Sequence, residues 1–281
     1  SRQRKIRTDE ERKAKKENHT ECPQKEGVKM KRIAVVTGAS SGMGREFVMR
    51  LNTFCPDLNE IWVLARRRER LEQLAVQCPV PVRIFAGDLT KKKFRRVLEN
   101  TLREEQPVVR ILINAAGFGK TGPVAEIAAA DRKVQTDMID VNCRALTDIT
   151  ESCLPFLRRG SRIINLASAA AFCPQPSFAV YAATKAYVLS FSRALNIELK
   201  GQGIFVTAVC PGPVKTEFFR VSGSPPSSVK KQFAAEAPAV VRKALRDSLR
   251  KKDLSVYGAG IKLAGLGAKL LPHRLIMRMF C

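Results

Sequence analysis

An alternation of short apolar runs with helical segments, extending from residue 32 to residue 258, constrains the fold of this 281-residue chain most strongly. We expect strands at 32–37, 61–66, 82–88, 109–117, 162–168, 204–212 and 254–258. We expect helices at 44–54, 68–77, 92–105, about 131–157, 177–199 and 239–252. Strands that are apolar on both faces belong in a parallel sheet covered by helices on both sides. Right-handed crossovers then predict an α/β fold, a single doubly wound domain with a parallel sheet of about seven strands.

Three segments differ from this rhythm. Residues 1–29 are polar and dense in lysine, arginine and glutamate, so we expect a basic, disordered leader without a core. The folded domain is expected at 30–258. Within it, the Gly, Pro and Ser content of residues 220–239 predicts a mobile loop with a short helix. The substrate loop is expected at about 213–236. Residues 259–281 form an apolar, basic C-terminal tail that contains no acids.

The formal net charge of +24 favours contact with phosphates, nucleic acid or anionic lipid. No zinc-ligand spacing or recognition-helix pattern accompanies this charge, so specific nucleic-acid binding is not expected. The eight cysteines are scattered without a C-x-x-C pair, and His19 and His273 lie in opposite tails, so no metal site is expected. No secretory signal and no long apolar run is visible, which predicts a cytoplasmic location with reduced thiols.

A glycine-rich turn, "TGASSGMG", joins the first expected strand to the first expected helix. Glycines at such a turn let the backbone approach a pyrophosphate, and the helix N-terminus adds a favourable dipole. The spacing is G-x-x-x-G-x-G rather than the commoner G-x-G-x-x-G, and its position between strand and helix gives it weight. The cofactor-binding residues predicted here are Gly38, Ser40, Ser41, Gly42, Met43 and Gly44.

The end of the second expected strand bears on which dinucleotide fits. An NAD(H) site usually places an acid there, on the ribose hydroxyls. This chain has Ala65 followed by arginines, whose guanidinium groups suit a 2′-phosphate. We therefore predict NADP(H), with NAD(H) less favoured, and assign the phosphate to Arg66 and Arg67. The following Arg68 and Arg70 are interpreted as a solvated charge run.

Seven short motifs occur in order along residues 31–260. They are "TGASSGMG", "GDL" at 87–89, "NAAG" at 114–117, "DVN" at 140–142, "NLAS" at 165–168, "YAATK" at 181–185 and "PGPVKT" at 211–216. Each motif is weak alone, but the ordered set is specific. With them the chain resembles the short-chain dehydrogenase/reductase family. The resemblance implies a Rossmann-type catalytic domain and the reduction of a ketone, or oxidation of a secondary alcohol, with a nicotinamide cofactor.

The resemblance also implies roles for individual residues. Ser168, Tyr181 and Lys185 match the catalytic serine, tyrosine and lysine of the family, and Asn142 matches the asparagine that completes a tetrad. The further cofactor-binding residues that it implies, besides Tyr181 and Lys185, are Asp88 and Leu89 at the adenine, Asn114, Ala115 and Gly117 along the central strand turn, and Pro211, Gly212, Val214 and Thr216 at the nicotinamide.

The chemistry gives these residue types a reason. A ketone that accepts hydride needs a proton, and Tyr181 supplies a phenol whose ordinary pKa is near 10. Lys185 follows one helical turn later, and its ammonium is expected to lower that pKa. Ser168 would donate to the carbonyl oxygen, and Asn142 would position a water that resupplies Lys185 with protons. Taken alone, each residue also has a purely structural interpretation: Ser168 as a helix or turn cap, Asn142 as a surface amide and Tyr181 as a core aromatic.

Substrate and partners are less constrained. The loop at 213–236 would close over substrate, with apolar contacts from Phe118, Phe172, Phe178 and "EFF" at 217–219. A lipophilic ketone or alcohol such as a steroid or bile acid is the first hypothesis, and a 3-oxoacyl thioester is the alternative. An alternative of another class is a non-catalytic NADP(H)-sensing or nucleic-acid-binding protein on this fold. We expect a homodimer or homotetramer through helices near 131–157 and 178–200. The tail would cover the pocket, join an interface or contact a membrane peripherally.

Overall fold

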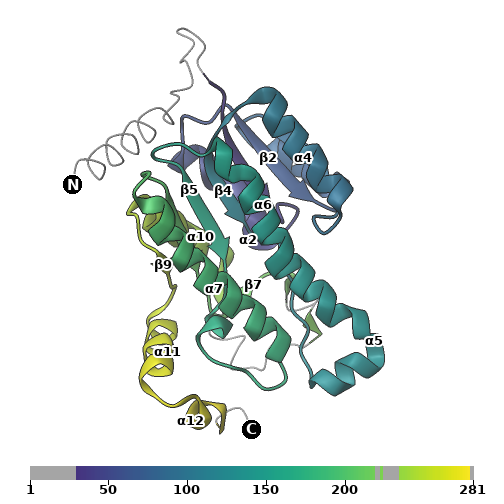
Figure 1. Cartoon of the computed structure of the whole chain (residues 1–281), viewed down its shortest axis with the longest axis vertical. Helices are drawn as coiled ribbons and strands as arrows, with labels where there is room; N and C mark the ends of the chain where they lie inside the picture. Colours follow the sequence, from purple (N-terminus) through teal and green to yellow (C-terminus); the bar gives the residue numbers. More distant parts are fainter. Residues whose placement is uncertain (1–29, 219–221, 224–233, 279–281) are drawn as a thin grey trace, which may run out of the picture. The chain divides into compact units, whose positions relative to one another are not determined.

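Seven parallel strands form the central sheet of the computed structural model, in the order β3-β2-β1-β4-β5-β6-β9 (Figure 1). The strands are β1 (Arg32–Thr37), β2 (Glu60–Ala65), β3 (Val82–Ala86), β4 (Val108–Asn114), β5 (Arg162–Leu166), β6 (Phe205–Val209) and β9 (Leu254–Ser255). The structure describes residues 30–218, 222–223 and 234–278. The predicted doubly wound α/β fold and its count of about seven strands are confirmed. The predicted leader at 1–29 lies outside the described residues.

Helices follow the strands along the chain, together with one short π-helical segment and two 3-10 turns in the described residues. The helices of the domain are α2 (Gly42–Phe54), α3 (Arg68–Gln77), α4 (Lys92–Glu105), α5 (Val124–Ile139), α6 (Leu146–Cys153), α7 (Ala179–Lys200) and α10 (Ala237–Leu249). A second small sheet pairs β7 (Val214–Lys215) with β8 (Ala235–Glu236). This pairing brings both ends of the predicted substrate loop together, while residues 219–221 and 224–233 of that loop lie outside the described residues.

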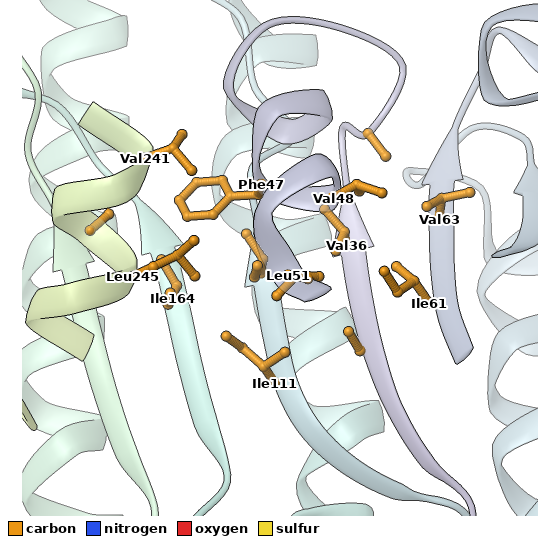
Figure 2. Packing of buried hydrophobic residues seen from close by; sticks show 14 of the residues in the cluster. Val36, Phe47, Val48, Leu51, Ile61, Val63, Ile111, Ile164, Val241 and Leu245 are labelled. Atoms are coloured by element: carbon orange, nitrogen blue, oxygen red, sulfur yellow. The ribbon is translucent and has the colours of Figure 1, made fainter. Parts of the chain in front are cut away.

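One face of the sheet packs against α2, α3 and α10. Figure 2 shows Phe47 and Leu51 of α2 beside Val241 and Leu245 of α10, over the sheet residue Ile164. All of these side chains are almost completely buried. Because large apolar groups leave water here, each contributes on the order of 1.5–3 kcal/mol to folding. This layer holds the first helix, and with it the glycine-rich turn, firmly on the sheet.

The opposite face packs against α4, α6 and α7. Val35 points to this side while its neighbour Val36 points to the other, as the alternation of a strand requires. Trp62 of β2 is fully buried here and lies against Phe85, with ring centres 5.3 Å apart. Both faces of the sheet are therefore covered, which explains why the strands are apolar throughout.

Strand order reverses between β1 and β4, and ligands of open α/β sheets bind at such a point, beyond the carboxyl ends of the strands. Thr37 ends β1 and pairs in register with Asn114 at the end of β4, which pairs with Asn165 near the end of β5. Motifs that are far apart in the sequence therefore meet at the carboxyl ends of the central strands.

The helical region predicted at about 131–157 differs from the structure. Helix α5 begins at Val124, and non-helical backbone at Asp131, with φ −156° and ψ 95°, bends it. A π-helical segment, η1 (Asp140–Ala145), then separates α5 from α6. Such wider turns occur often at functional sites, and this one contains Asn142 of the "DVN" motif. Hydrophobic spacing predicts the helical region but not its interruption.

The predicted tail contains two helices, α11 (Ala259–Leu270) and α12 (His273–Arg278). They belong to the compact unit that begins at Lys31. Contacts join α11 to the rest of this unit. The domain boundary expected at residue 258 therefore stays a prediction. Of the helices in the described ranges, none has the length and apolar character needed to cross a bilayer.

Candidate active site

The turn between β1 and α2 can be built only with glycine at two positions. Gly38 has φ +69°, and a Cβ there would lie 2.7 Å from the backbone nitrogen of Ala116. A Cβ on Gly44 would lie 2.3 Å from the carbonyl oxygen of Gly38. The hydroxyl of Thr37 accepts hydrogen bonds from the backbone of Ala115 and Ala116, both at 3.1 Å. The turn is thereby held against the end of β4, at the start of α2, where a dinucleotide pyrophosphate would meet the helix N-terminus.

Arg67 links this turn to the segment that follows "PGPVKT". Its Nη2 donates to Ser41 Oγ at 2.6 Å and to Ser40 Oγ at 3.2 Å. Its Nη1 donates to Glu217 Oε2 at 3.0 Å, and Arg70 Nη1 donates to Glu217 Oε1 at 2.7 Å. These hydrogen bonds hold the pKa of Glu217 below its usual range. Arg70, interpreted from sequence as part of a solvated run, is thus a partner of an acid 147 residues away.

Arg66 differs from Arg67, because its side chain is exposed and forms no ion pair with any described residue. It lies near Asp88, whose Oδ1 accepts from the backbone and hydroxyl of Thr90 at 2.9 and 2.8 Å. Burial raises the pKa of Asp88, but the bonds from Thr90 and the charges of Lys91 and Arg66 outweigh it and leave that pKa below its ordinary value. Leu89 beside it is buried.

Tyr181 lies in the first turn of α7, near Ser168, which follows β5. The Tyr181 phenol is buried. Burial raises its pKa to about 12, and the nearby Ser168 hydroxyl opposes that rise. The expectation that Lys185 lowers the pKa of Tyr181 below 10 is therefore wrong for the free protein. Loss of water around the phenol outweighs the stabilisation of a phenolate.

Lys185 is buried one turn further along α7. Its Nζ donates to the carbonyl oxygen of Leu166 at 2.7 Å and lies 5.7 Å from the centre of the Tyr181 ring. Burial lowers the pKa of this ammonium to about 8. The lysine is therefore a cation at neutral pH that can release its proton readily.

Asn142 joins three parts of the site from the π-helical segment. Its Nδ2 donates to Phe118 O at 2.9 Å and to Thr184 Oγ1 at 3.0 Å, and its Oδ1 accepts from Phe118 N at 3.0 Å. A Cβ on Gly117 would lie 2.9 Å from Asn142 Oδ1 and 3.3 Å from Lys185 Nζ. The amide and the ammonium therefore converge on the strand turn that Gly117 leaves open.

The "PGPVKT" segment passes between the catalytic residues and the glycine-rich turn. Pro211 O accepts from Ala169 N at 2.8 Å, next to Ser168. Thr216 lies against the turn, 3.5 Å from the position that a Cβ on Gly42 would take. The backbone of Val214 lies in β7, and Gly212 faces helix α11. The structure thus brings the predicted nicotinamide loop beside both halves of the site.

Aromatic side chains cover the phenol. Phe178 stacks on Tyr181 with ring centres 4.3 Å apart, and Phe218 lies over it at 5.4 Å. A Cβ on Gly119 would contact all three rings. Phe118 belongs to the same cluster. Of the apolar residues predicted at the substrate pocket, Phe172 lies elsewhere, against Gly265 of the tail, and Phe219 lies outside the described residues.

Sequence reasoning missed several supporting residues. The interpretation of "EFF" as an apolar stretch overlooks Glu217, an acid directly after "PGPVKT" in the sequence. Asn114, predicted at the cofactor, turns its side chain inward and donates to Thr150 Oγ1 at 3.0 Å and Asn165 Oδ1 at 2.9 Å. Asn165 in turn donates to Ser192 Oγ at 2.9 Å. This buried chain of polar groups ties β4 and β5 to α6 and α7 beneath the site.

Comparison with known proteins agrees with this geometry. The family model for short chain dehydrogenases matches residues 32–225. A sulfoacetaldehyde reductase from Chromohalobacter salexigens is 35% identical over 195 residues, which cover 67% of this chain and 75% of that protein. This chain belongs to the short-chain dehydrogenase/reductase family and is an oxidoreductase.

Solved structures show the same fold. A short-chain dehydrogenase from Sphingobium yanoikuyae, in complex with NADPH, is 29% identical with a TM-score of 0.71 and covers 85% of this chain and 94% of its own. A bulky-bulky ketone specific alcohol dehydrogenase from Comamonas testosteroni is 26% identical with a TM-score of 0.67, covering 85% and 92%. The predicted family and enzyme class are therefore confirmed, while the role of each site residue stays a prediction.

Proposed function

We propose that this protein interconverts a lipophilic ketone and its secondary alcohol with NADP(H). The observation that carries the proposal is the convergence of Ser168, Tyr181 and Lys185 beside a glycine-built turn, at the carboxyl edge of the sheet. When bound, the nicotinamide supplies or accepts the hydride. The chain's own residues orient the two reactants and move the proton.

The proton chemistry follows from the burial of these groups. With a pKa of about 12, Tyr181 stays a phenol at neutral pH and can donate to a carbonyl oxygen as charge develops on it. Ser168 donates a second hydrogen bond to the same oxygen. The Lys185 ammonium lies close enough to stabilise the phenolate that remains. Asn142, beside Lys185 across Gly117, positions a water that returns the proton.

The preference for NADP(H) is supported by charge at the end of β2. Arg67 already bonds two serines of the glycine-rich turn, so its guanidinium lies where the adenosine ribose would meet the protein. Arg66 is exposed beside Asp88 and is available to the same phosphate. Since β2 ends in Ala65 and places no carboxylate where a 2′-phosphate would lie, both arginines favour NADP(H) over NAD(H).

The aromatic cover supports a lipophilic substrate. Phe118, Phe178 and Phe218 surround the reacting phenol, so a substrate must contact apolar rings to reach it. A steroid or bile-acid skeleton fits these surroundings. The likeness to an alcohol dehydrogenase specific for bulky ketones favours the same class, whereas the likeness to sulfoacetaldehyde reductase makes a small aldehyde the control substrate.

The proposed oligomer is a dimer in which α7 and the α5–α6 region face their copies. On α7, Tyr187 and Ile197 are exposed, and Ile139 is exposed at the end of α5. Large apolar groups on one helical surface favour burial against another subunit. Two such dimers would form the proposed tetramer.

A substrate screen with both cofactors tests the function. Purified protein is first titrated with NADPH and NADH by cofactor fluorescence, and absorbance loss is then followed with steroid ketones, bulky aryl ketones, a 3-oxoacyl thioester and small aldehydes. The proposal predicts turnover of a bulky ketone with NADPH. If only the 3-oxoacyl thioester is turned over, the substrate is a 3-oxoacyl thioester and not a lipophilic ketone. NADPH binding without turnover of any carbonyl compound would indicate a non-catalytic sensor.

A further inference from the structure

Helix α11 of the tail has one side fixed on the domain. Ile261 lies against the nicotinamide loop, since a Cβ on Gly212 would come within 2.7 Å of its Cδ1. Gly265 lies against Phe172, whose ring a Cβ would approach to 3.0 Å. Ala268 continues this side and is buried. The spacing of these residues, i, i+4 and i+7, follows one face of a helix. The orientation of α11 is therefore set by packing.

The opposite side of α11 carries a row of exposed leucines. Leu263, Leu266 and Leu270, at i, i+3 and i+7, are 68%, 54% and 74% exposed. Leu271 and Leu275 extend the row through the next turn and α12, at 53% and 52% exposure. A helix that is apolar on both sides normally has both sides covered. Five exposed leucines on one short segment therefore indicate a surface that contacts another protein or a membrane.

The segment that carries these leucines contains no acid. No Asp or Glu follows Asp253 in the sequence, whereas Lys262, Lys269, Arg274 and Arg278 do. Lys262 and Arg274 are exposed on the same two helices. Apolar side chains flanked by cations are the pattern of helices that lie in the plane of an anionic membrane surface.

We propose that α11 and α12 dock this protein on an anionic lipid surface. The leucine row would insert among the acyl chains, and the lysine and arginine groups would contact lipid phosphates. A second copy of the chain fits less well, because it would bring two cationic tails together without an acid in either to pair them. Because each exposed leucine leaves water on insertion, the loss of three leucines should change binding measurably.

Vesicle binding by the full chain tests this proposal without any cofactor or substrate, so its outcome is independent of the proposed reaction. Flotation is compared for vesicles of phosphatidylcholine with and without phosphatidylglycerol, at low and high salt. We expect binding to the anionic vesicles to be at least about tenfold tighter and to weaken with salt. The triple variant L263S/L266S/L270S should lose about tenfold or more of that binding.

Matched variants separate insertion from other effects. Val76→Ser and Val97→Ser replace exposed apolar residues on α3 and α4 and should leave vesicle binding unchanged. If the triple variant does not fold, Lys262→Glu with Arg274→Glu changes only exposed groups and should abolish the lipid preference. Equal binding to neutral and anionic vesicles would overturn the proposal. Binding of the leucine variant that equals binding of the unmodified protein would also overturn it. A third contradicting result is that the unmodified protein binds no vesicles and the leucine variant dissociates into smaller oligomers, which would make the leucine row a subunit interface.

Discussion

The two halves of the site are built in different ways. Tyr181, Lys185 and Asn142 are buried by 93% or more. Hydrogen bonds hold Lys185 and Asn142, and aromatic rings pack against Tyr181. Arg67 and Glu217, at the adenosine end, keep 40% and 35% of their side chains exposed and are held by one another. The buried half is therefore preorganised by the fold, whereas the exposed half depends on a loop that reaches it from the far end of the sheet.

This difference separates chemistry from selectivity. A buried group has its pKa shifted by the protein, as in Tyr181 and Lys185, so substitution there should change the rate of reaction. An exposed ion pair is screened by water and salt and contributes little to stability. Substitution there should instead change which cofactor binds.

Asn142→Ala should damage both the fold and the rate. The change leaves the backbone of Phe118 and the hydroxyl of Thr184 without their partner, in a buried position. The expected cost is about 2 kcal/mol, or a fall in melting temperature of roughly 5 °C. Turnover should fall about 100-fold because Lys185 loses its neighbour. Thermal unfolding and steady-state kinetics measure both, and a variant of normal stability and rate would remove Asn142 from the site.

Arg67→Ala should weaken NADPH far more than NADH. The guanidinium is expected to contribute a charge-assisted bond to the 2′-phosphate, so its loss should raise the dissociation constant for NADPH by about 10- to 100-fold. Arg68→Ala, which removes an exposed arginine of the same segment, is the matched control. Fluorescence titration measures the binding of each cofactor. An equal loss for NADPH and NADH would refute the assignment of the phosphate.

The reduction rate should fall as pH rises through the pKa of Lys185, which is about 8. Below that pH the ammonium is present and stabilises the phenolate that forms; above it the charge is lost while Tyr181, with a pKa of about 12, still holds its proton. The expected decline approaches tenfold per pH unit. A profile of kcat/KM from about pH 6 to about pH 10 measures it. A flat profile across this range would show that Lys185 does not supply the charge.

Glu217→Gln should change the dissociation constant for NADPH only slightly, and it should lower that constant where Arg67→Ala raises it. Glu217 occupies Arg67 and Arg70, so a 2′-phosphate must compete with its carboxylate. Removing that charge should tighten NADPH by about two- to fivefold, the scale of an exposed ion pair. Glu236→Gln, which alters an exposed acid paired with Lys215, provides a control on a neighbouring segment. Weaker binding of NADPH by Glu217→Gln would instead indicate that the Arg67–Glu217 ion pair stabilises the bound cofactor.

Sequence patterns predict most of the fold because its strands are apolar throughout and its motifs stand at strand ends. They predict that Ser168, Tyr181 and Lys185 come together, since helical spacing joins two of them and strand order supplies the third. They do not predict the π-helical turn at Asn142, whose amide bonds Phe118 and Thr184 in distant parts of the sequence, or the inward side chain of Asn114. The pairing of Arg67 with Glu217 spans 150 residues, and no local pattern carries it.

The turnover of Tyr181→Phe with NADPH and NADH in parallel tests the separation of chemistry from selectivity most directly. Tyr187→Phe, on the exposed side of the same helix, is the matched control, since it also loses one phenol that bonds a neighbour, Thr147. Tyr181→Phe should lower kcat about 1000-fold with either cofactor and leave both dissociation constants unchanged, while Tyr187→Phe should behave as the unmodified protein. A Tyr181→Phe variant that keeps kcat within about tenfold of the unmodified protein would contradict the assignment of Tyr181 as the proton donor.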